Sequence, residues 1–275
     1  MKKLMKLGIA GLGAGAAWGL LLRPRQNHPG WGALSGVRYA HRGLHDASQG
    51  VPENSMAAFR RAVDHGFGAE LDVHLMADGE LAVVHDSCLK RVCGADVEVE
   101  DLTAADLARY PLMGTEETIP LFREVLALFE GKTPLVIELK VERGNANALT
   151  DRVMAALAGW NGTYCVESFH PGALLRLKEK YPEVIRGQLS QDFLKDSEVG
   201  SLSWPVRFML TNLLTTAAAG PDFIAYKWQD RDNPSLRLMK ALYGVHEVAW
   251  TVRDRETMER LERDGVVPIF EGFIP

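Results

Sequence analysis

The chain has 275 residues, of which 47% are hydrophobic and 24% are charged. This composition is typical of a globular protein and argues against extended disorder. From Asp46 onward the sequence holds 24 basic and 36 acidic residues, a net charge of −12, which argues against a nucleic-acid-binding protein.

Residues 1–25 are predicted to form an N-terminal membrane anchor or signal-like segment. Three lysines precede an uncharged apolar run over 7–22, two arginines follow it, and no acidic residue occurs before Asp46. This layout is typical of a signal sequence or an anchor. Because no Ala-x-Ala site follows the run, we expect an uncleaved anchor and a membrane-associated protein, and we favour the extracytoplasmic side. The alternative is a buried helix of the soluble domain.

Residues 26–36 contain Asn27, Pro29 and three glycines, and they are predicted to form a linker. In 37–275, β-rich runs alternate with helical patterns. The eight predicted strands are 37–41, 68–74, 134–140, 163–168, 184–189, 223–227, 247–252 and 266–271. Helices are predicted over 54–65, 121–130, 145–158, 171–180 and 254–264. This alternation predicts an α/β fold, a TIM (β/α)8 barrel, with an open doubly wound sheet as the competing architecture.

The second predicted strand carries acids where a buried strand should carry aliphatic residues. Glu70 and Asp72 share one face, because side chains on a strand repeat every two residues. Two carboxylates side by side repel each other unless a positive charge lies between them, and a divalent cation is the simplest candidate. The dipeptide Asp78-Gly79 favours a two-residue hairpin, which would pair Asp72 with His85 and gather all three side chains into one patch.

We expect residues 86–118 to form a small insertion after the second strand, without a core of its own. In a barrel, the active groups lie at the carboxyl ends of the strands. The ends of the predicted strands and of the hairpin carry three carboxylates, two histidines and two cations: Glu70, Asp72, Glu138, His41, His85, Arg42 and Lys140. Burial of uncompensated ionisable groups is costly, so this collection predicts a functional site.

Eight short motifs along the chain occur in the order seen in glycerophosphodiester phosphodiesterases, which the sequence resembles from about residue 37 to its C-terminus. The motifs are His41-Arg-Gly, Pro52-Glu-Asn-Ser, Glu70-Leu-Asp-Val, Asp78-Gly, Val83-Val-His-Asp86, Ile137-Glu-Leu-Lys140, Ser168-Phe169 and Trp250-Thr-Val252. The resemblance implies a TIM barrel that uses one divalent cation.

The resemblance also implies a role for each residue of the predicted site. It assigns metal binding to Glu70, Asp72 and Glu138, general acid and base catalysis to His41 and His85, and phosphate binding to Arg42 and Lys140. Carboxylate ligands suit Mg²⁺ or Ca²⁺. Candidates for the substrate pocket are Phe169 and Trp250, with Trp228 as a further aromatic, and Glu53 as a supporting residue that could equally belong to a helix cap.

The implied reaction is metal-dependent hydrolysis of glycerophosphodiesters to sn-glycerol 3-phosphate and an alcohol. The alternatives are a lysophospholipase D that acts on membrane lysolipids and a non-catalytic membrane-surface binding module. The expected partners are a small-molecule glycerophosphodiester or lysolipid and a membrane bound through residues 7–22, but no nucleic acid. The last strand ends in Phe270-Glu-Gly-Phe-Ile-Pro275 instead of the Thr-Asp-x-Pro usual in the family, and we expect this difference to affect substrate choice rather than activity.

Overall fold

The computed structural model describes residues 15–196 and 202–275. Its eight parallel strands are β1 (Tyr39–Ala40), β2 (Gly68–Leu75), β4 (Leu135–Leu139), β5 (Tyr164–Ser168), β6 (Arg186–Ser190), β7 (Phe223–Lys227), β8 (His246–Val252) and β9 (Val267–Phe270). Strand β1 pairs with both β2 and β9, so the sheet closes on itself. The predicted TIM barrel is therefore confirmed, and the open sheet is excluded.

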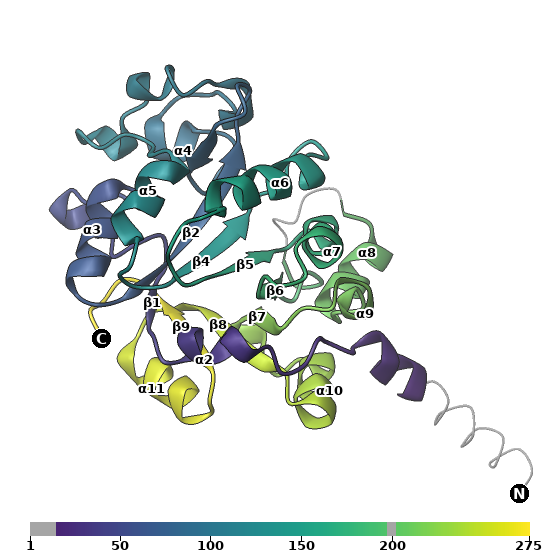
Figure 1. Ribbon diagram of the computed structural model, residues 1–275. Coiled ribbons are helices and arrows are strands. Elements are labelled where there is room, and N and C mark those ends of the chain that lie inside the picture. Colours follow the sequence, from purple (N-terminus) through teal and green to yellow (C-terminus); the bar gives the residue numbers. More distant parts are fainter. Residues whose placement is uncertain (1–14, 197–201) are drawn as a thin grey trace, which may run out of the picture.

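Helices surround this barrel and connect its strands (Figure 1). They are α3 (Met56–Asp64), α5 (Phe122–Phe129), α6 (Ala146–Leu157), α7 (Pro171–Lys180), α10 (Pro234–Tyr243) and α11 (Arg255–Arg263). Helix α3 begins where the Ser55 hydroxyl accepts the backbone N–H of Ala58, a standard N-cap. Two further helices, α8 (Trp204–Thr211) and α9 (Thr216–Ala219), lie between β6 and β7, where no helix was predicted.

The two faces of the barrel strands have different roles. Leu71 and Val73 of β2 belong to the largest apolar cluster, together with residues of the surrounding helices such as Phe122. Residues of the opposite face, such as Val136 and Phe223, form a second apolar cluster with other strand residues. Because side chains alternate, Glu70 and Asp72 lie on the face opposite Leu71 and Val73.

The hairpin after β2 differs from the prediction. Strand β3 (Leu81–Val83) pairs antiparallel with β2, with Leu75 opposite Leu81 and Val73 opposite Val83. The loop therefore holds three residues rather than two, with Gly79 at a φ of 83°. A three-residue loop needs only its last residue in the left-handed region, which suits Asp78-Gly79 as well as a two-residue turn does.

The predicted pairing of Asp72 with His85 is therefore wrong by one residue. Val84 takes the place opposite Asp72 and donates its backbone N–H to the carbonyl of Asp72 at 3.1 Å. Strand β3 ends at Val83, so the strict alternation of side chains ends before His85. The His85 side chain still lines the same cavity as Glu70.

The insertion over 86–118 contains α4 (Lys90–Cys93) and the 3₁₀ turns η3 (Val99–Asp101), η4 (Leu107–Arg109) and η5 (Leu112–Gly114). Its apolar side chains pack in a cluster that it shares with the hairpin region. Buried side chains of the insertion, such as Leu89 and Leu112, form an apolar cluster with Ala82 and Val84 of the hairpin region. The insertion and the hairpin therefore stabilise each other.

The predicted anchor lies partly outside the described residues, which begin at Gly15. Of the described residues of this segment, 15–21 are helical. Trp18 donates its indole N–H to Ser235 Oγ at 3.1 Å, and Leu22 is fully buried against residues of β7 and α10. None of the helices in 15–196 and 202–275 is long and apolar enough to cross a membrane, which contradicts the predicted membrane location.

The segment predicted as a linker contains η1 (Pro29–Trp31) and α2 (Gly32–Ser35). Leu34 is buried in the same apolar cluster as Phe223, and Trp31 stacks on His246 with ring centroids 4.4 Å apart. The boundaries of 1–25, 26–36 and 37–275 stay predictions.

Candidate active site

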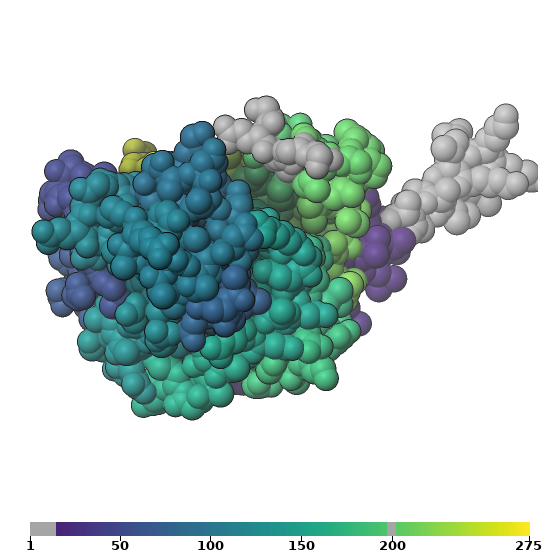
Figure 2. Space-filling model, turned by 90° about the horizontal axis from the view of Figure 1, so that it is seen from above, coloured from purple at the N-terminus to yellow at the C-terminus, as the bar shows by residue number. Residues whose placement is uncertain are grey.

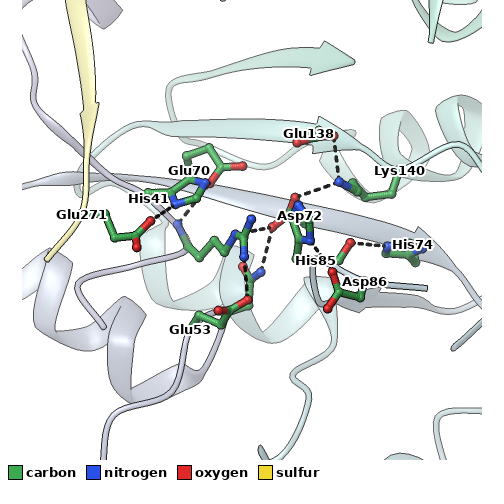
Figure 3. A network of polar contacts seen from close by, with 12 residues as sticks. His41, Glu53, Glu70, Asp72, His74, His85, Asp86, Glu138, Lys140 and Glu271 are labelled. Atoms are coloured by element: carbon green, nitrogen blue, oxygen red, sulfur yellow. Dashed lines mark hydrogen bonds and ion pairs between the residues drawn. The ribbon is translucent and has the colours of Figure 1, made fainter. Parts of the chain in front are cut away.

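Three carboxylates meet at the carboxyl ends of β2 and β4. Asp72 lies directly opposite Glu138 in the register of the two strands, and Glu70 precedes Asp72 on the same face. All three side chains are buried, and one oxygen from each lies within 4.8 Å of the others (Figure 3). Asp72 Oδ1 is buried and accepts no hydrogen bond. The set thus offers oxygen ligands of the kind that Mg²⁺ and Ca²⁺ prefer.

The electrostatics of the three carboxylates favour a cation between them. Burial raises the pKa of Glu70 well above its usual value, and repulsion from Asp72 and Glu138 adds to this. Burial likewise raises the pKa of Glu138. Burial also acts to raise the pKa of Asp72, but the charges of Lys140, His85 and Arg42 outweigh it and lower that pKa. Three neighbouring buried carboxyl groups can all be ionised only when a positive charge compensates them. The three acids therefore fit a divalent cation.

Two histidines line the same cavity, and each has a carboxylate on Nδ1. His41 follows β1, and its Nδ1 lies 2.7 Å from Glu271 Oε2, while its Nε2 lies 3.9 Å from Glu70 Oε2. His85 Nδ1 lies 2.6 Å from Asp86 Oδ1. A carboxylate at Nδ1 fixes the ring orientation and leaves Nε2 for proton transfer.

The pair of His41 and Glu271 shifts the pKa of both groups. Burial lowers the pKa of His41, and the hydrogen bond with Glu271 partly opposes this shift. Burial acts to raise the pKa of Glu271, but the hydrogen bond and the charge of His41 outweigh it and lower that pKa to about 2. Glu271 therefore remains an anion beside the imidazole at neutral pH.

Two cations lie between the carboxylates. Arg42, at a φ of 52°, donates its backbone N–H to Glu70 Oε2 at 3.1 Å, and its guanidinium lies 3.5 Å from Asp72. Lys140 Nζ lies 3.1 Å from Glu138 and 3.6 Å from Asp72. The mouth of the barrel therefore presents positive charge next to the acidic cluster, which suits a phosphate group beside a metal.

Glu53 lies behind Arg42 rather than in the cavity. Its carboxylate accepts hydrogen bonds from Arg42 at 2.7 Å and from two nitrogens of Arg91, at 2.7 and 2.9 Å. Arg91, from the insertion, also donates to Asp86, the partner of His85. Glu53 thus links the insertion to the residues around the cavity, and its supporting role stays a prediction. The alternative role of the segment 52–55, a helix cap, is confirmed, because Ser55 caps α3.

A cavity of about 310 Å³ brings most of the predicted residues together: His41, Arg42, Glu70, His85, Glu138, Phe169 and Trp250 all line it. Asp72, Lys140 and Glu53 do not line it, but each contacts a residue that does. Phe169 and Trp250 form one wall, edge to face at 5.6 Å. Trp228 packs against the large apolar cluster and under Arg260 instead.

The sequence prediction assigned no role to several residues of the site. Glu167 of β5 lies opposite Glu138, lines the cavity, and has an Oε2 atom without a hydrogen-bond partner. Burial raises its pKa well above the usual value. Glu167 alternates with Val166 on a buried strand and shares a face with Cys165. This pattern resembles the one that singled out Glu70, so this acid could have been found.

Asp86, Arg91 and Glu271 were also without a predicted role. Asp86 directly follows His85, a position that could have suggested a partner. No motif or pattern in the neighbouring sequence indicates a role for Arg91 or Glu271. The contact between Glu271 and His41 joins residues 230 positions apart. The C-terminal segment therefore takes part in the site, contrary to the expectation that its departure from the family pattern lies outside the acid–base set.

His74 is fully buried and does not line the cavity. Its Nδ1 lies 2.6 Å from Glu100 Oε1. Its Nε2 lies 3.2 Å from the backbone carbonyl of His85 (Figure 3). His74 therefore joins η3 of the insertion to the segment that carries His85.

Residues 41–274 match the glycerophosphoryl diester phosphodiesterase family. The chain is 29% identical over 237 residues to a glycerophosphodiester phosphodiesterase of Caldanaerobacter subterraneus, covering 82% of this chain and 90% of that relative. It is 40% identical over 114 residues to a lysophospholipase D of Rattus norvegicus, covering 37% of this chain and 35% of the relative.

Solved structures share the fold. A phosphodiesterase of Oleispira antarctica, in complex with the product sn-glycerol-3-phosphate, superposes with a TM-score of 0.70 at 23% identity, over 87% of this chain and 94% of that one. The family match begins directly after β1 and includes the other seven barrel strands and every residue of the acidic cluster. The chain therefore belongs to the glycerophosphoryl diester phosphodiesterase family and is a phosphoric diester hydrolase rather than a non-catalytic binding module.

Proposed function

We propose that this chain hydrolyses glycerophosphodiesters to sn-glycerol 3-phosphate and an alcohol at the mouth of its barrel, with one divalent cation. The observation that carries the proposal is the convergence of a buried three-carboxylate cluster and two carboxylate-partnered histidines on one cavity. Family membership and the name of the relative from Caldanaerobacter subterraneus support it.

Glu70, Asp72 and Glu138 would hold the cation, Mg²⁺ or Ca²⁺. When bound, such a cation supplies Lewis-acid stabilisation of the charge that grows on the phosphoryl oxygens. Two observations support this assignment: Asp72 Oδ1 is buried without a hydrogen bond, and the pKa of Glu70 is raised.

Arg42 and Lys140 would bind the phosphate oxygens. A phosphodiester is an anion, and the two cations offset the negative charge of the acids around them. A guanidinium presents several N–H donors in a fixed plane and suits two oxygens of one phosphate.

His41 and His85 would transfer the protons. One imidazole removes a proton from the attacking hydroxyl, and the other donates a proton to the leaving alkoxide. Glu271 and Asp86 hold the two rings by their Nδ1 atoms, so that each Nε2 is available to the substrate.

Product analysis on the full chain tests this function. With Mg²⁺ or Ca²⁺, glycerophosphocholine and glycerophosphoethanolamine should each yield sn-glycerol 3-phosphate and the free alcohol. A chelator should abolish turnover, and added cation should restore it. Release of phosphocholine with glycerol would show cleavage of the other ester bond, and full activity in chelator would remove the cation from the mechanism.

A second candidate activity is that of a lysophospholipase D, the name of the relative from Rattus norvegicus. It cleaves the same kind of phosphodiester bond, in a substrate that also carries one acyl chain. The specific observation in its favour is an apolar cavity beside the catalytic one.

A further inference from the structure

The guanidinium of Arg91 lies between two carboxylates, those of Asp86 and Glu53. Its Nε donates to Asp86 Oδ2 at 2.5 Å, and its two terminal nitrogens donate to Glu53 at 2.7 and 2.9 Å. Figure 3 shows the two carboxylates on the same side of Asp72. Arg91 does not line the catalytic cavity, so any effect that it has on the reaction must pass through these two carboxylates.

Each of these carboxylates holds a residue of the proposed mechanism. Asp86 contacts Arg91 with Oδ2 and His85 Nδ1 with Oδ1, the latter at 2.6 Å. Glu53 Oε1 accepts hydrogen bonds from both Arg91 and Arg42, each at 2.7 Å. A single carboxylate therefore separates Arg91 from a proposed general acid or base, and another separates it from a proposed phosphate-binding residue.

The insertion fixes the position of Arg91 on α4. Leu89, just before this helix, and Val92, within it, are buried in the apolar cluster that the insertion shares with the hairpin region. Seen from above, the insertion forms a broad, continuous part of the molecular surface, in blue (Figure 2). Because buried neighbours hold its backbone and three nitrogens are hydrogen-bonded, the guanidinium is a fixed support for the two carboxylates.

An ion pair that only stabilises the fold is the alternative role for Arg91. Exposed ion pairs contribute little to stability, and the Arg91 side chain is 45% exposed, whereas those of Glu53 and Asp86 are 11% and 28% exposed. The two carboxylates are turned towards His85 and Arg42 with their other contacts. Such an arrangement is typical of groups that orient functional residues.

We propose that Arg91 is a positioning residue: by binding Asp86 and Glu53 at once, it holds His85 and Arg42 in the orientations that hydrolysis requires. This inference rests on the proposed function, because the roles of His85 and Arg42 come from it. The insertion then contributes to catalysis through a residue that does not contact the substrate. Loss of Arg91 should lower kcat, through proton transfer at His85, and raise KM, through the phosphate contact of Arg42.

The variant Arg91→Gln removes the charge and the bidentate contact. With glycerophosphocholine and a divalent cation, it should lower kcat/KM about tenfold or more, since groups that orient functional residues typically contribute this much. Arg91→Lys keeps the charge but lacks the planar fork, so its activity should lie between those of Arg91→Gln and the wild type. The matched control is Lys90→Gln. Lys90 is the neighbour on α4, is 72% exposed and lies 3.7 Å from Asp96, and its loss should change kcat/KM less than about twofold.

Double-mutant cycles separate positioning from a general loss of structure. In His85→Ala, the further change Arg91→Gln should lower kcat less than about threefold, because the histidine that Arg91 holds is absent. In Glu53→Gln, it should leave KM within about twofold, because the link to Arg42 is already lost. Equal losses in the wild type and in both variant backgrounds overturn the inference, and so does wild-type kcat and KM in Arg91→Gln. Circular dichroism verifies folding, and Arg91→Lys replaces Arg91→Gln in both cycles if the latter does not fold.

NMR of the histidine ring protons supplies a readout that does not depend on turnover. The Nδ1–H proton of His85, assigned by its absence in His85→Ala, should be strongly deshielded, because its contact with Asp86 is only 2.6 Å long. In Arg91→Gln this signal should shift or broaden, and in Lys90→Gln it should stay unchanged. If the wild type hydrolyses no glycerophosphodiester, the proposed function fails. An unchanged signal in Arg91→Gln then overturns the positioning role, and a changed signal supports it.

Discussion

The two ends of the barrel bury carboxylates in different ways. Near the amino ends of the strands, Glu247 of β8 accepts hydrogen bonds from Arg231 and Lys240, and Asp222, just before β7, pairs with Arg25. At the carboxyl ends, Glu70 has no Lys or Arg side chain within ion-pair distance among the described residues.

The difference separates carboxylates whose charge is paired within the fold from carboxylates that we propose bind a cation. An ionised carboxylate is costly to bury unless a cation pairs with it, and the amino end of the barrel supplies such cations. At the carboxyl end, Lys140 and Arg42 pair with Glu138 and Asp72, but the cost remains for Glu70 and Glu167, and burial raises the pKa of both. Buried carboxyl groups with raised pKa values are typical of functional sites.

The largest expected effect comes from Glu70→Gln. Loss of one proposed metal ligand should lower kcat/KM by about 10³-fold, because Lewis-acid stabilisation contributes several kcal/mol. Activity assays against glycerophosphocholine and calorimetric titration with Mg²⁺ measure the loss of turnover and of affinity.

The same variant should stabilise the cation-free protein. A carboxyl whose pKa is raised by folding lowers stability as the pH rises above its unfolded value, because the unfolded chain ionises first. The gain in Tm from Glu70→Gln in chelator should therefore be larger at pH 8 than at pH 5. An unchanged Tm at both pH values would contradict the uncompensated burial of Glu70.

The next largest effect is expected from His85→Ala. Removal of a general acid or base should lower kcat roughly 10²-fold or more. Because His85 is not a proposed ligand, calorimetry should show cation affinity within a few-fold of that of the wild type. The matched control is His65→Ala, which alters a histidine at the end of α3 whose side chain contacts a backbone carbonyl of that helix, and it should retain full activity.

A smaller effect is expected from Glu271→Gln. The amide keeps a hydrogen-bonding group near His41 Nδ1 but loses the anionic charge that fixes the ring. Partners that orient a functional histidine typically contribute about tenfold or more, so kcat should fall about tenfold with little change in KM. Glu271→Asp keeps the charge and should retain more activity than the amide. Equal KM and kcat in all three proteins would remove Glu271 from the site.

The smallest effect on activity should come from the amino end of the barrel. Glu247→Gln leaves Arg231 and Lys240 without their buried anion and should lower the free energy of unfolding by about 1–3 kcal/mol. Urea denaturation measures this change, and kcat/KM below the unfolding transition should remain within twofold of wild type. If Glu247→Gln lost as much activity as Glu70→Gln, the proposed difference between the amino and carboxyl ends of the barrel would be wrong.

The sequence by itself determined the barrel strands and the acidic cluster. The eight predicted strands overlap those observed, because alternating and helical periods follow directly from backbone geometry. The same alternation places Glu70 and Asp72 on one face. The hairpin register is a local feature that the sequence did not decide, since Asp78-Gly79 fits loops of two and of three residues equally well.

Only the tertiary structure decided the contacts between distant segments. Three of these contacts close the barrel and build the site: the pairing of β1 with β9, the contact of His41 with Glu271, and the bridge from Arg91 through Glu53 to Arg42. No periodic pattern in the sequence relates the segments that they join. The packing of Leu22 on the barrel, in place of a predicted membrane contact, belongs with them. The physical reason is that periodicity reports the direction of a side chain, whereas packing of the whole chain selects its partner.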